Sequence, residues 1–249
     1  MAARVPFLLQ LLSIGLLVAV WQAATAAIDS RLLPGPMAVL DALVRDIGEG
    51  ELPYHLGVTL ARVAASFVIA MVIGTAVGIV MGRSKVVDRF FDSWLVLFLN
   101  LPALVTIILA YVWFGLVEAA AIAAVAVNKI PNVVVTVREG ARALDRDYME
   151  MAEVFRLGRW RSLRHVVLPQ LYPFLMASAR SGLALIWKIV LVVELLGRSN
   201  GVGFQLHLFF QLFDITSILA YTIAFIAVIQ VIELAIMQPL ERRATRWRR

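Results

Sequence analysis

Two lysines lie deep inside apolar segments of this chain, Lys129 next to Asn128 and Lys188 next to Trp187. A charged group at the centre of a membrane helix costs roughly 2.5 to 3.5 kcal/mol, and it normally faces protein or water. Because both groups are cations, they favour a path for an anion. The polar and helix-breaking residues that could line such a path are Asn100, Pro102, Asn128, Lys129, Arg180, Lys188 and Glu194.

A structural interpretation of the two lysines competes with this one. Glu194 lies near the end of the segment that holds Lys188, and Glu233 lies within the last apolar segment, so either acid could pair with a lysine and hold helices together. The same four groups could also form a proton or ion relay in a stand-alone secondary transporter or channel. Arg62 could likewise pair structurally or extend its side chain toward water.

No set of residues predicts catalysis, a metal site or a bound cofactor in this chain. The histidines, His55, His165 and His207, fall on different connections, and there is no cysteine. Serines are scattered without a base at a suggestive spacing. The sequence also lacks the Gly-x-x-x-x-Gly-Lys-Ser/Thr pattern of a nucleotide-binding loop, so we expect no ATP hydrolysis by that route from this chain alone.

The composition sets the environment of these residues. The 249 residues are 61% hydrophobic and 16% charged, which is too apolar for one water-soluble domain. We therefore expect a single all-α transmembrane domain over residues 1–249 in a lipid bilayer. The formal charge of +6 does not indicate nucleic acid, because the basic residues lie between apolar segments and not on one polar face.

About six segments are long enough to span a bilayer, which needs roughly 20 apolar residues. The first could instead be a cleaved signal peptide, although its apolar run exceeds the roughly 7 to 15 residues of a signal core. Pro102 predicts a kink or break in the third, which would then lie near the bundle interior. The predicted spans are residues 6–28, 55–81, 90–114, 118–137, 172–196 and 218–240.

The distribution of Lys and Arg predicts the orientation. With the N-terminus in the cytoplasm, 16 basic residues fall in cytoplasmic segments and three fall outside. Both termini and the charged stretch 145–168 are therefore expected in the cytoplasm. On the outer side, residues 37–44 predict a short amphipathic helix, and the Gly-rich residues 197–204 predict a turn before another short helix.

The stretch 145–168 predicts two short helices joined by a turn. Asp147 would cap the first helix with Glu150 at its third position, Gly158 would allow the turn, and a second helix would stop before Pro169. A solvated amphipathic loop is the plainer interpretation, but its apolar residues favour a docking surface. The residues expected to act in docking are Asp147, Glu150, Met151, Ala152, Val154, Phe155, Gly158 and Trp160.

This stretch resembles the EAA loop of the permease subunits of bacterial ABC importers, and it is most similar to the nitrate, sulfonate and taurine type. The resemblance rests on Glu150-Met151-Ala152 and on Leu168-Pro169, and it extends from about residue 33 to the basic C-terminus. Arg156 stands where the family loop usually has Gly, so a turn that is shifted, or tighter on one side, is expected. Supporting stretches are Trp113-Phe114-Gly115, Val193-Glu194-Leu195-Leu196-Gly197, Asn200-Gly201-Val202-Gly203 and Phe213-Asp214.

The resemblance implies a MetI-like type I importer permease in the bacterial cytoplasmic membrane. Residues 1–54 would form an N-terminal helix and outer amphipathic segment, and residues 55–240 the permease core with its coupling hairpin 145–168. Two copies would form the path, ABC ATPase subunits would bind ATP-Mg in the cytoplasm, and a periplasmic or lipoprotein solute-binding protein would deliver the solute. A sulfonate, taurine, nitrate or bicarbonate are the expected substrates, between which the sequence does not choose.

Overall fold

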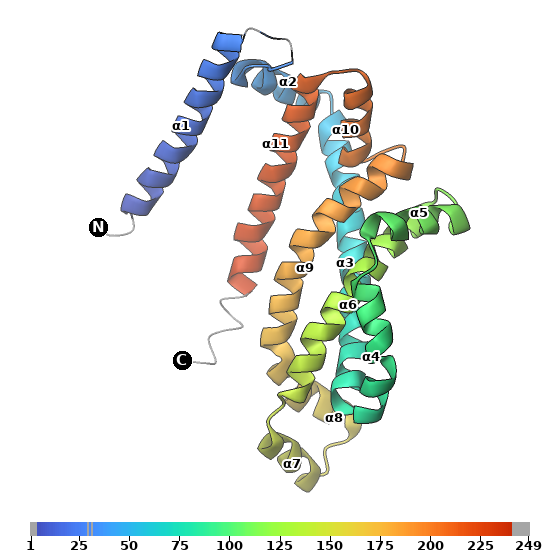
Figure 1. Cartoon of the computed structure of the whole chain (residues 1–249). Helices are drawn as coiled ribbons and strands as arrows, with labels where there is room; N and C mark the ends of the chain where they lie inside the picture. The colour runs from blue at the N-terminus through green and yellow to red at the C-terminus, as the bar shows by residue number, and fades with distance from the viewer. Residues whose placement is uncertain (1–3, 29, 31, 241–249) are drawn as a thin grey trace.

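The protein is all-helical, as expected, in a computed structural model that describes residues 4–28, 30 and 32–240 (Figure 1). Arg31 and the basic residues predicted beyond position 240 lie outside the described residues. No strand occurs in the described part of the chain. The helices are α1 (Arg4–Ile28), α2 (Pro36–Gly48), α3 (Glu51–Arg83), α4 (Lys85–Leu99), α5 (Ala103–Phe114), α6 (Glu118–Arg142), α7 (Arg146–Val154), α8 (Arg159–Ser162), α9 (Leu168–Gly197), α10 (Val202–Gln211) and α11 (Ile215–Ile232).

Three helical stretches of the described chain are long and apolar enough to cross a bilayer: α3, α6 and the stretch Ile215–Leu240 that begins with α11. Helices α4 and α5 add a fourth if the bent pair counts as one span. The six predicted spans also include α1 and α9. Helix α9 has 30 residues and runs beside α6, but it carries Arg180, Lys188 and Glu194. For α1 and α9 the crossing of the membrane therefore stays a prediction.

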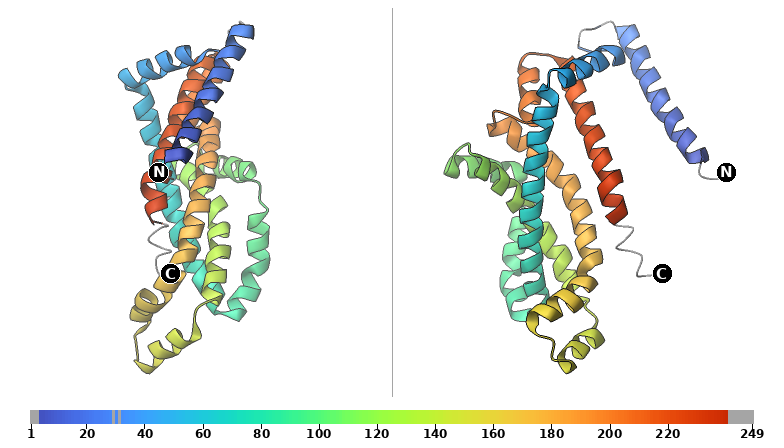
Figure 2. Two further views of the ribbon diagram at one scale, coloured as in Figure 1. Left: turned by 90° about the vertical axis from the view of Figure 1, so that its left-hand side faces the viewer. Right: turned by 180° about the vertical axis from the view of Figure 1, so that it is seen from behind.

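The short helices gather at the two ends of the long ones. Helices α2 and α10 lie at one end, and α7 and α8 lie at the other (Figures 1 and 2). This separation agrees with the two sides that the basic residues predict, although the direction of the chain across the membrane stays a prediction. Most of helix α1 stands apart from the bundle (Figure 2). Its end contacts α2, and Trp21 Nε1 of α1 donates to the carbonyl of Pro34, two residues before α2 begins, at 3.1 Å.

The expected break at Pro102 is a sharp bend. Helices α4 and α5 meet at 94° across residues 100–102, and Pro102 is the N-cap of α5. The amide of Asn100 donates to the carbonyl of Leu97, and its Nδ2 donates to Val96 O at 2.7 Å. The bend thus satisfies part of its own hydrogen bonding. Helix α5 buries Ile107, Ala110 and Tyr111, whereas α4 is mostly exposed, so the expectation that this segment lies in the interior of the bundle stays a prediction. Leu95 is the sole buried residue of α4 among the described side chains.

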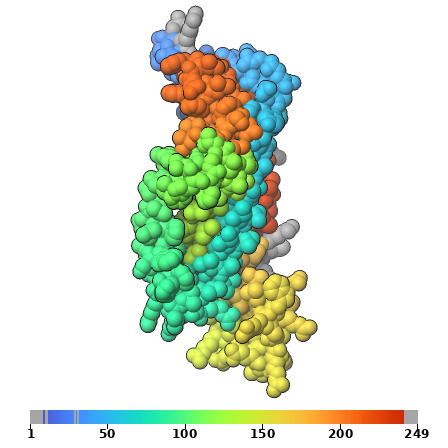
Figure 3. All heavy atoms as spheres, turned by 90° about the vertical axis from the view of Figure 1, so that its right-hand side faces the viewer, coloured from blue at the N-terminus to red at the C-terminus, as the bar shows by residue number. Residues whose placement is uncertain are grey.

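Within one chain, helices α4 and α5 lie along the outer side of α3 and α6 and form a rim there. Figure 3 shows this face, with α6 visible in the hollow beside α4. An apolar cavity of about 260 Å³ lies there, lined by α4 residues that include Phe91, Trp94 and Phe98, and by Pro131 of α6.

A stripe of small residues brings α3 and α6 into close contact. Gly74, Gly78 and Gly82 recur every four residues on α3, so they share one face. A Cβ atom at position 78 would lie 2.8 Å from the Cβ of Val137 and 3.0 Å from the carbonyl oxygen of Val134. Small residues at such spacing let helix backbones approach closely in a membrane. This contact fixes α3 against α6, and both helices carry residues of the site.

Gly78→Ala tests this contact. The added methyl group would overlap Val137, so we expect a loss of about 1 to 3 kcal/mol of stability and a lower midpoint of thermal unfolding in detergent. Gly57→Ala is the matched control on the same helix, because no atom lies within 4 Å of its Cβ position. That variant should gain up to about 1 kcal/mol from helix propensity. Equal midpoints for the two variants would contradict the contact.

Candidate translocation and coupling sites

A buried ion-pair network joins three helices at the α10 end of the bundle. The carboxylate of Glu194 on α9 has no exposed surface, and Arg62 on α3 is 3% exposed. Arg62 Nη1 donates to Glu194 Oε1 at 2.7 Å, Thr59 Oγ1 donates to the same oxygen at 2.9 Å, and the amide of Gly203 donates to Oε2 at 2.8 Å. The charge of Glu194 is therefore surrounded by donors, as a buried carboxylate requires.

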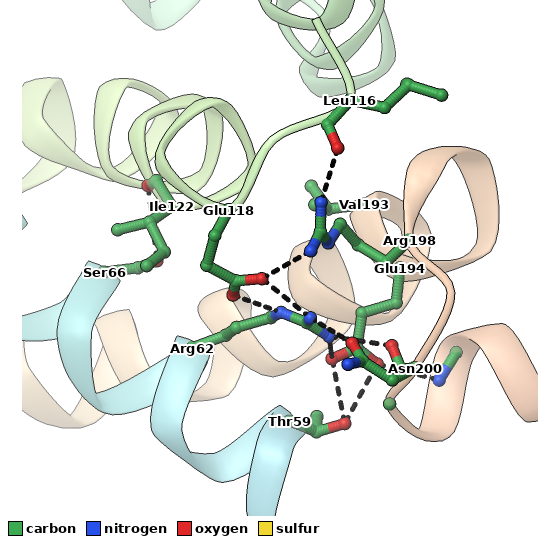
Figure 4. Close-up of polar contacts among 12 residues, drawn as sticks. Thr59, Arg62, Ser66, Leu116, Glu118, Ile122, Val193, Glu194, Arg198 and Asn200 are labelled. Carbon is green, nitrogen blue, oxygen red and sulfur yellow. Dashed lines mark hydrogen bonds and ion pairs between the residues drawn. The ribbon is translucent and has the colours of Figure 1, made fainter. Parts of the chain in front are cut away.

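The network extends to α6 and to the turn after α9 (Figure 4). Arg62 Nε donates to Glu118 Oε1 at 2.6 Å, and Arg198 Nη2 reaches Glu118 Oε2 at 2.8 Å. The carbonyl of Asn200 accepts from Arg62 Nη1 at 2.9 Å. Two arginines and two glutamates thus compensate one another, and they connect α3, α6 and α9 through side chains.

Gly201 lets the turn approach this network. Its φ of 104° is a conformation that favours glycine, and a Cβ there would lie 2.3 Å from the carboxyl carbon of Glu194. Glu194 and the Gly-rich turn are separate features in the sequence, and their contact was not predicted. Arg62 within an apolar segment was the available signal, because a cation there needs an acidic partner.

The predicted pairs of lysine with acid are wrong. Glu194 pairs with Arg62, and Glu233 pairs with Arg180 at 3.0 Å. Glu194, expected along a solute path, is enclosed by its donors. The predicted relay is therefore not formed in the described structure, because its two acids pair with arginines and not with Lys129 or Lys188.

The two lysines differ in their surroundings. Lys129 of α6 is 3% exposed and lies over Gly182 of α9, whereas Lys188 is on an exposed face of α9. Asn128 Nδ2 donates to the carbonyl of Ala124 at 2.9 Å, which is a bond within its own helix. The residues expected along the path thus do not meet in one cavity within a single chain. The described residues also contain no group of three His, Asp or Glu side chains suited to a metal ion.

Arg62→Met tests the buried network. Removing the guanidinium leaves Glu194 buried without its counter-charge, so we expect a loss of about 3 to 5 kcal/mol of stability. Changing both Arg62 and Glu194 to Met should recover a large part of the loss. Arg146→Met is the matched control, because Arg146 forms an exposed pair with Glu150 and pairs of that kind contribute about 1 kcal/mol or less. Equal unfolding midpoints for the two single variants would contradict this role of the network.

At the opposite end, the hairpin 145–168 forms a protruding pair of short helices (Figure 1). Asp145 caps α7, because its side chain accepts from the amide of Asp147 at 2.9 Å. The prediction of Asp147 as the N-cap is therefore wrong by two residues, because the N-cap is Asp145. Glu150 pairs with Arg146 at 2.9 Å, one turn before it, and does not form the predicted capping box.

The apolar side chains of the hairpin are so exposed that we expect a partner to cover them. Val154 is 79% exposed, and Phe155 and Trp160 are each 72% exposed. Met151 is also exposed, while Ala152 is buried. Neighbouring apolar side chains on a polar, basic segment are typical of a docking surface.

The turn of the hairpin lies at Arg156 and not at Gly158. Arg156 has a φ of 49°, and its amide donates to the carbonyl of Glu153 at 2.9 Å. The amide of Leu157 donates to Ala152 O at 2.9 Å, which completes a Schellman motif with Arg156 at its left-handed position. The expected shift of the turn is wrong, because these two bonds hold the arginine where other members usually have glycine.

The second half of the hairpin continues into the membrane helix. Helix α8 leads through a π-helical turn, Leu163–Val167, into α9 without a stop. The amide of Leu168 donates to the carbonyl of Leu163, and Pro169 occupies the first turn of α9. The prediction that the helix stops before Pro169 is wrong, because the π-helical turn directly before this proline is the kind of local adjustment with which a membrane helix continues past a proline. Movement of the hairpin can thus reach α9 directly.

Arg156→Gly tests the turn. A left-handed residue with a Cβ costs roughly 1 to 2 kcal/mol, and glycine removes this cost. We expect slower hydrogen exchange at the amides of residues 156 and 157. Gly158→Ala is the control, since Gly158 has a φ of −58° and open space around its Cβ position. Faster exchange in Arg156→Gly would contradict the Schellman turn.

Solved structures define the class of this fold. An inward-facing crystal form of the methionine ABC transporter MetNI matches with a TM-score of 0.65 at 18% identity, covering 86% of this chain and 100% of that chain. An amino acid ABC transporter matches with a TM-score of 0.62 at 20% identity, covering 81% and 97%. The fold is therefore that of the MetI-like membrane subunits of ABC transporters.

The sequence family narrows this class. Residues 57–246 match the binding-protein-dependent transport system inner membrane component, and the chain belongs to this family of multi-pass inner-membrane permeases. The chain is 31% identical over 233 residues to SsuC of Escherichia coli (strain K12), named as an aliphatic sulfonates transport permease protein, covering 93% of this chain and 88% of SsuC. It is 29% identical to the taurine transport system permease protein TauC of the same strain (95% and 89%). It is 23% identical to the nitrate import permease protein NrtB of Synechococcus elongatus (80% and 75%).

Proposed function

We propose that this chain is the membrane subunit of an ATP-driven importer for a small anion. Its relatives are transport permeases whose names refer to sulfonates, taurine and nitrate. Each of these solutes carries a negatively charged oxyanion group. The positive charges of the buried Lys129 and of Lys188 on the exposed face of α9 suit such a solute, and so does that of Arg180. These residues, with Asn100, Pro102 and Asn128 on neighbouring helices, form the proposed path, while Glu194 acts in the network that holds the helices together.

The exposed apolar surface of the hairpin is the observation that carries the proposal. Val154, Phe155 and Trp160 would enter a groove of a cytoplasmic ABC ATPase subunit, and the ATP-Mg would bind there and not in this chain. The capped helix and its Schellman turn make the hairpin stiff, and α8 leads directly into α9. Closure of the ATPase pair can therefore move the membrane helices, as a switching element requires.

Two copies of the chain are proposed to enclose the path. Within one chain Lys188 faces outward on α9 and the α4–α5 bend lies on the rim. A second copy would cover these surfaces and bring the path residues inside. A solute-binding protein on the outer side would deliver the anion near α2 and α10.

The test uses the chain in proteoliposomes with its ATPase subunit and binding protein. We expect vanadate-sensitive ATP hydrolysis and solute uptake from the complete set, and neither activity from this chain alone. Val154→Asp should weaken binding of the ATPase subunit at least about tenfold, because it places a charge in the apolar contact. Val44→Asp on α2 is the matched control for this binding, as an exposed valine at the other end of the protein. Uptake by this chain alone, driven by an ion gradient, would overturn the proposal.

A further inference from the structure

Lys129 is a buried cation that forms no ion pair with any acid in the described part of the chain. The buried charged residues of the described chain are Asp46, Arg62, Lys129 and Glu194. Asp46 pairs with Arg45, and Arg62 pairs with Glu194. Within the described residues no carboxylate pairs with Lys129. A charge in this position is costly unless another group compensates it.

Gly182 of α9 provides the space for this lysine. A Cβ at position 182 would lie 2.4 Å from Cε of Lys129 and 3.1 Å from its Nζ. The end of the lysine side chain thus passes directly over the backbone of α9. Any other residue at position 182 would displace it, so Gly182 positions the cation in the contact between α6 and α9.

A second polar group without a partner lies on the same face of α9. Ser178 is one turn before Gly182, is 1% exposed, and its Oγ makes no hydrogen bond in the described structure. A buried hydroxyl without a partner is uncommon in native proteins and needs an explanation. Lys129 and Ser178 are both hydrogen-bond donors, and Ser178 lies one turn of α9 from the glycine that Lys129 covers. An acceptor with a negative charge would satisfy both groups.

Among the described residues, the acids on α9 and on the stretch that follows α11 are Glu194 and Glu233, and both are already engaged. Glu194 is held by Arg62, Thr59 and the amide of Gly203. Glu233 is held by Arg180. The anion for Lys129 must therefore come from outside these pairs.

We propose that Lys129 and Ser178 bind the oxyanion head group of the transported solute in the α6–α9 contact, with Gly182 as the positioning residue. The inference rests on the proposed function and specifies its anion site. A sulfonate fits this chemistry, because its three oxygens accept from an ammonium and a hydroxyl at once, and bonds to a charged group are the stronger kind. The lysine fills the space over Gly182 in this structure, so the anion enters when α6 and α9 separate at this point.

The experiment measures thermal unfolding of the complex of this chain with its ATPase subunit. The probes are ethanesulfonate, nitrate and chloride at equal ionic strength, without nucleotide and with ATP and vanadate. We expect ethanesulfonate to raise the midpoint by at least about 3 °C in one of the two conditions, as a ligand at saturating concentration does. Lys129→Met should abolish this rise, and Ser178→Ala should reduce it by half or more. Lys85→Met, an exposed lysine at the start of α4, is the matched control and should keep the full rise.

Three results would overturn the site. They are no rise for the unmodified complex, an undiminished rise in Lys129→Met, or an equal rise with chloride, which would indicate an inorganic counter-ion. If Lys129→Met does not fold, Lys129→Gln and Ser178→Ala decide the same question. ATP hydrolysis distinguishes this failure from failure of the proposed function: vanadate-sensitive activity with no anion effect removes the site alone, whereas absence of that activity removes the function.

Discussion

The pairing of Arg62 with Glu194 is the interaction on which the arrangement of this protein depends. Both charges are buried, so each needs the other, and neither helix can move away without leaving a charge uncompensated. Glu118, Arg198 and the Gly201 turn complete the network at one end of the bundle. Helices α3, α6 and α9 are thereby joined at this end of the bundle, which a membrane alone would not achieve, because lipid is as apolar as the helices themselves.

In the proposed function, this network would pass movement of the hairpin on to the membrane helices. The hairpin lies at the opposite end of the bundle and continues through a π-helical turn into α9, the helix that carries Glu194. A displacement at Phe155 therefore reaches a helix that is tied to two others. Arg138 and Arg142 of α6 also pair with Asp88 of α4 near the same end, so the rim helices are joined to the same unit. Force applied to the hairpin would move these helices together.

Arg62 and Lys129 differ in how the protein compensates their buried charges. Arg62 has acidic and carbonyl acceptors around its guanidinium, whereas Lys129 has none from the described acids and lies against a glycine. For Arg62, the protein itself compensates the free-energy cost of burying the charge. For Lys129, compensation by a bound solute would link solute binding to the separation of α6 and α9. With the proposed anion site, one fold would hold both a fixed charge network and a charge that binds the transported anion.

Several features followed from the sequence because they depend on neighbouring residues: the apolar helices, the break at Pro102, the two-part hairpin and the resemblance to importer permeases. The cap at Asp145, the turn at Arg156 and the helix through Pro169 escaped prediction, because hydrogen bonds a few residues away decide between closely similar local structures. The partners of the buried charges were decided by the tertiary structure alone. Arg62 and Glu194 are 132 residues apart, and only the packing of α3 against α6 and α9 determines which acid a buried cation meets.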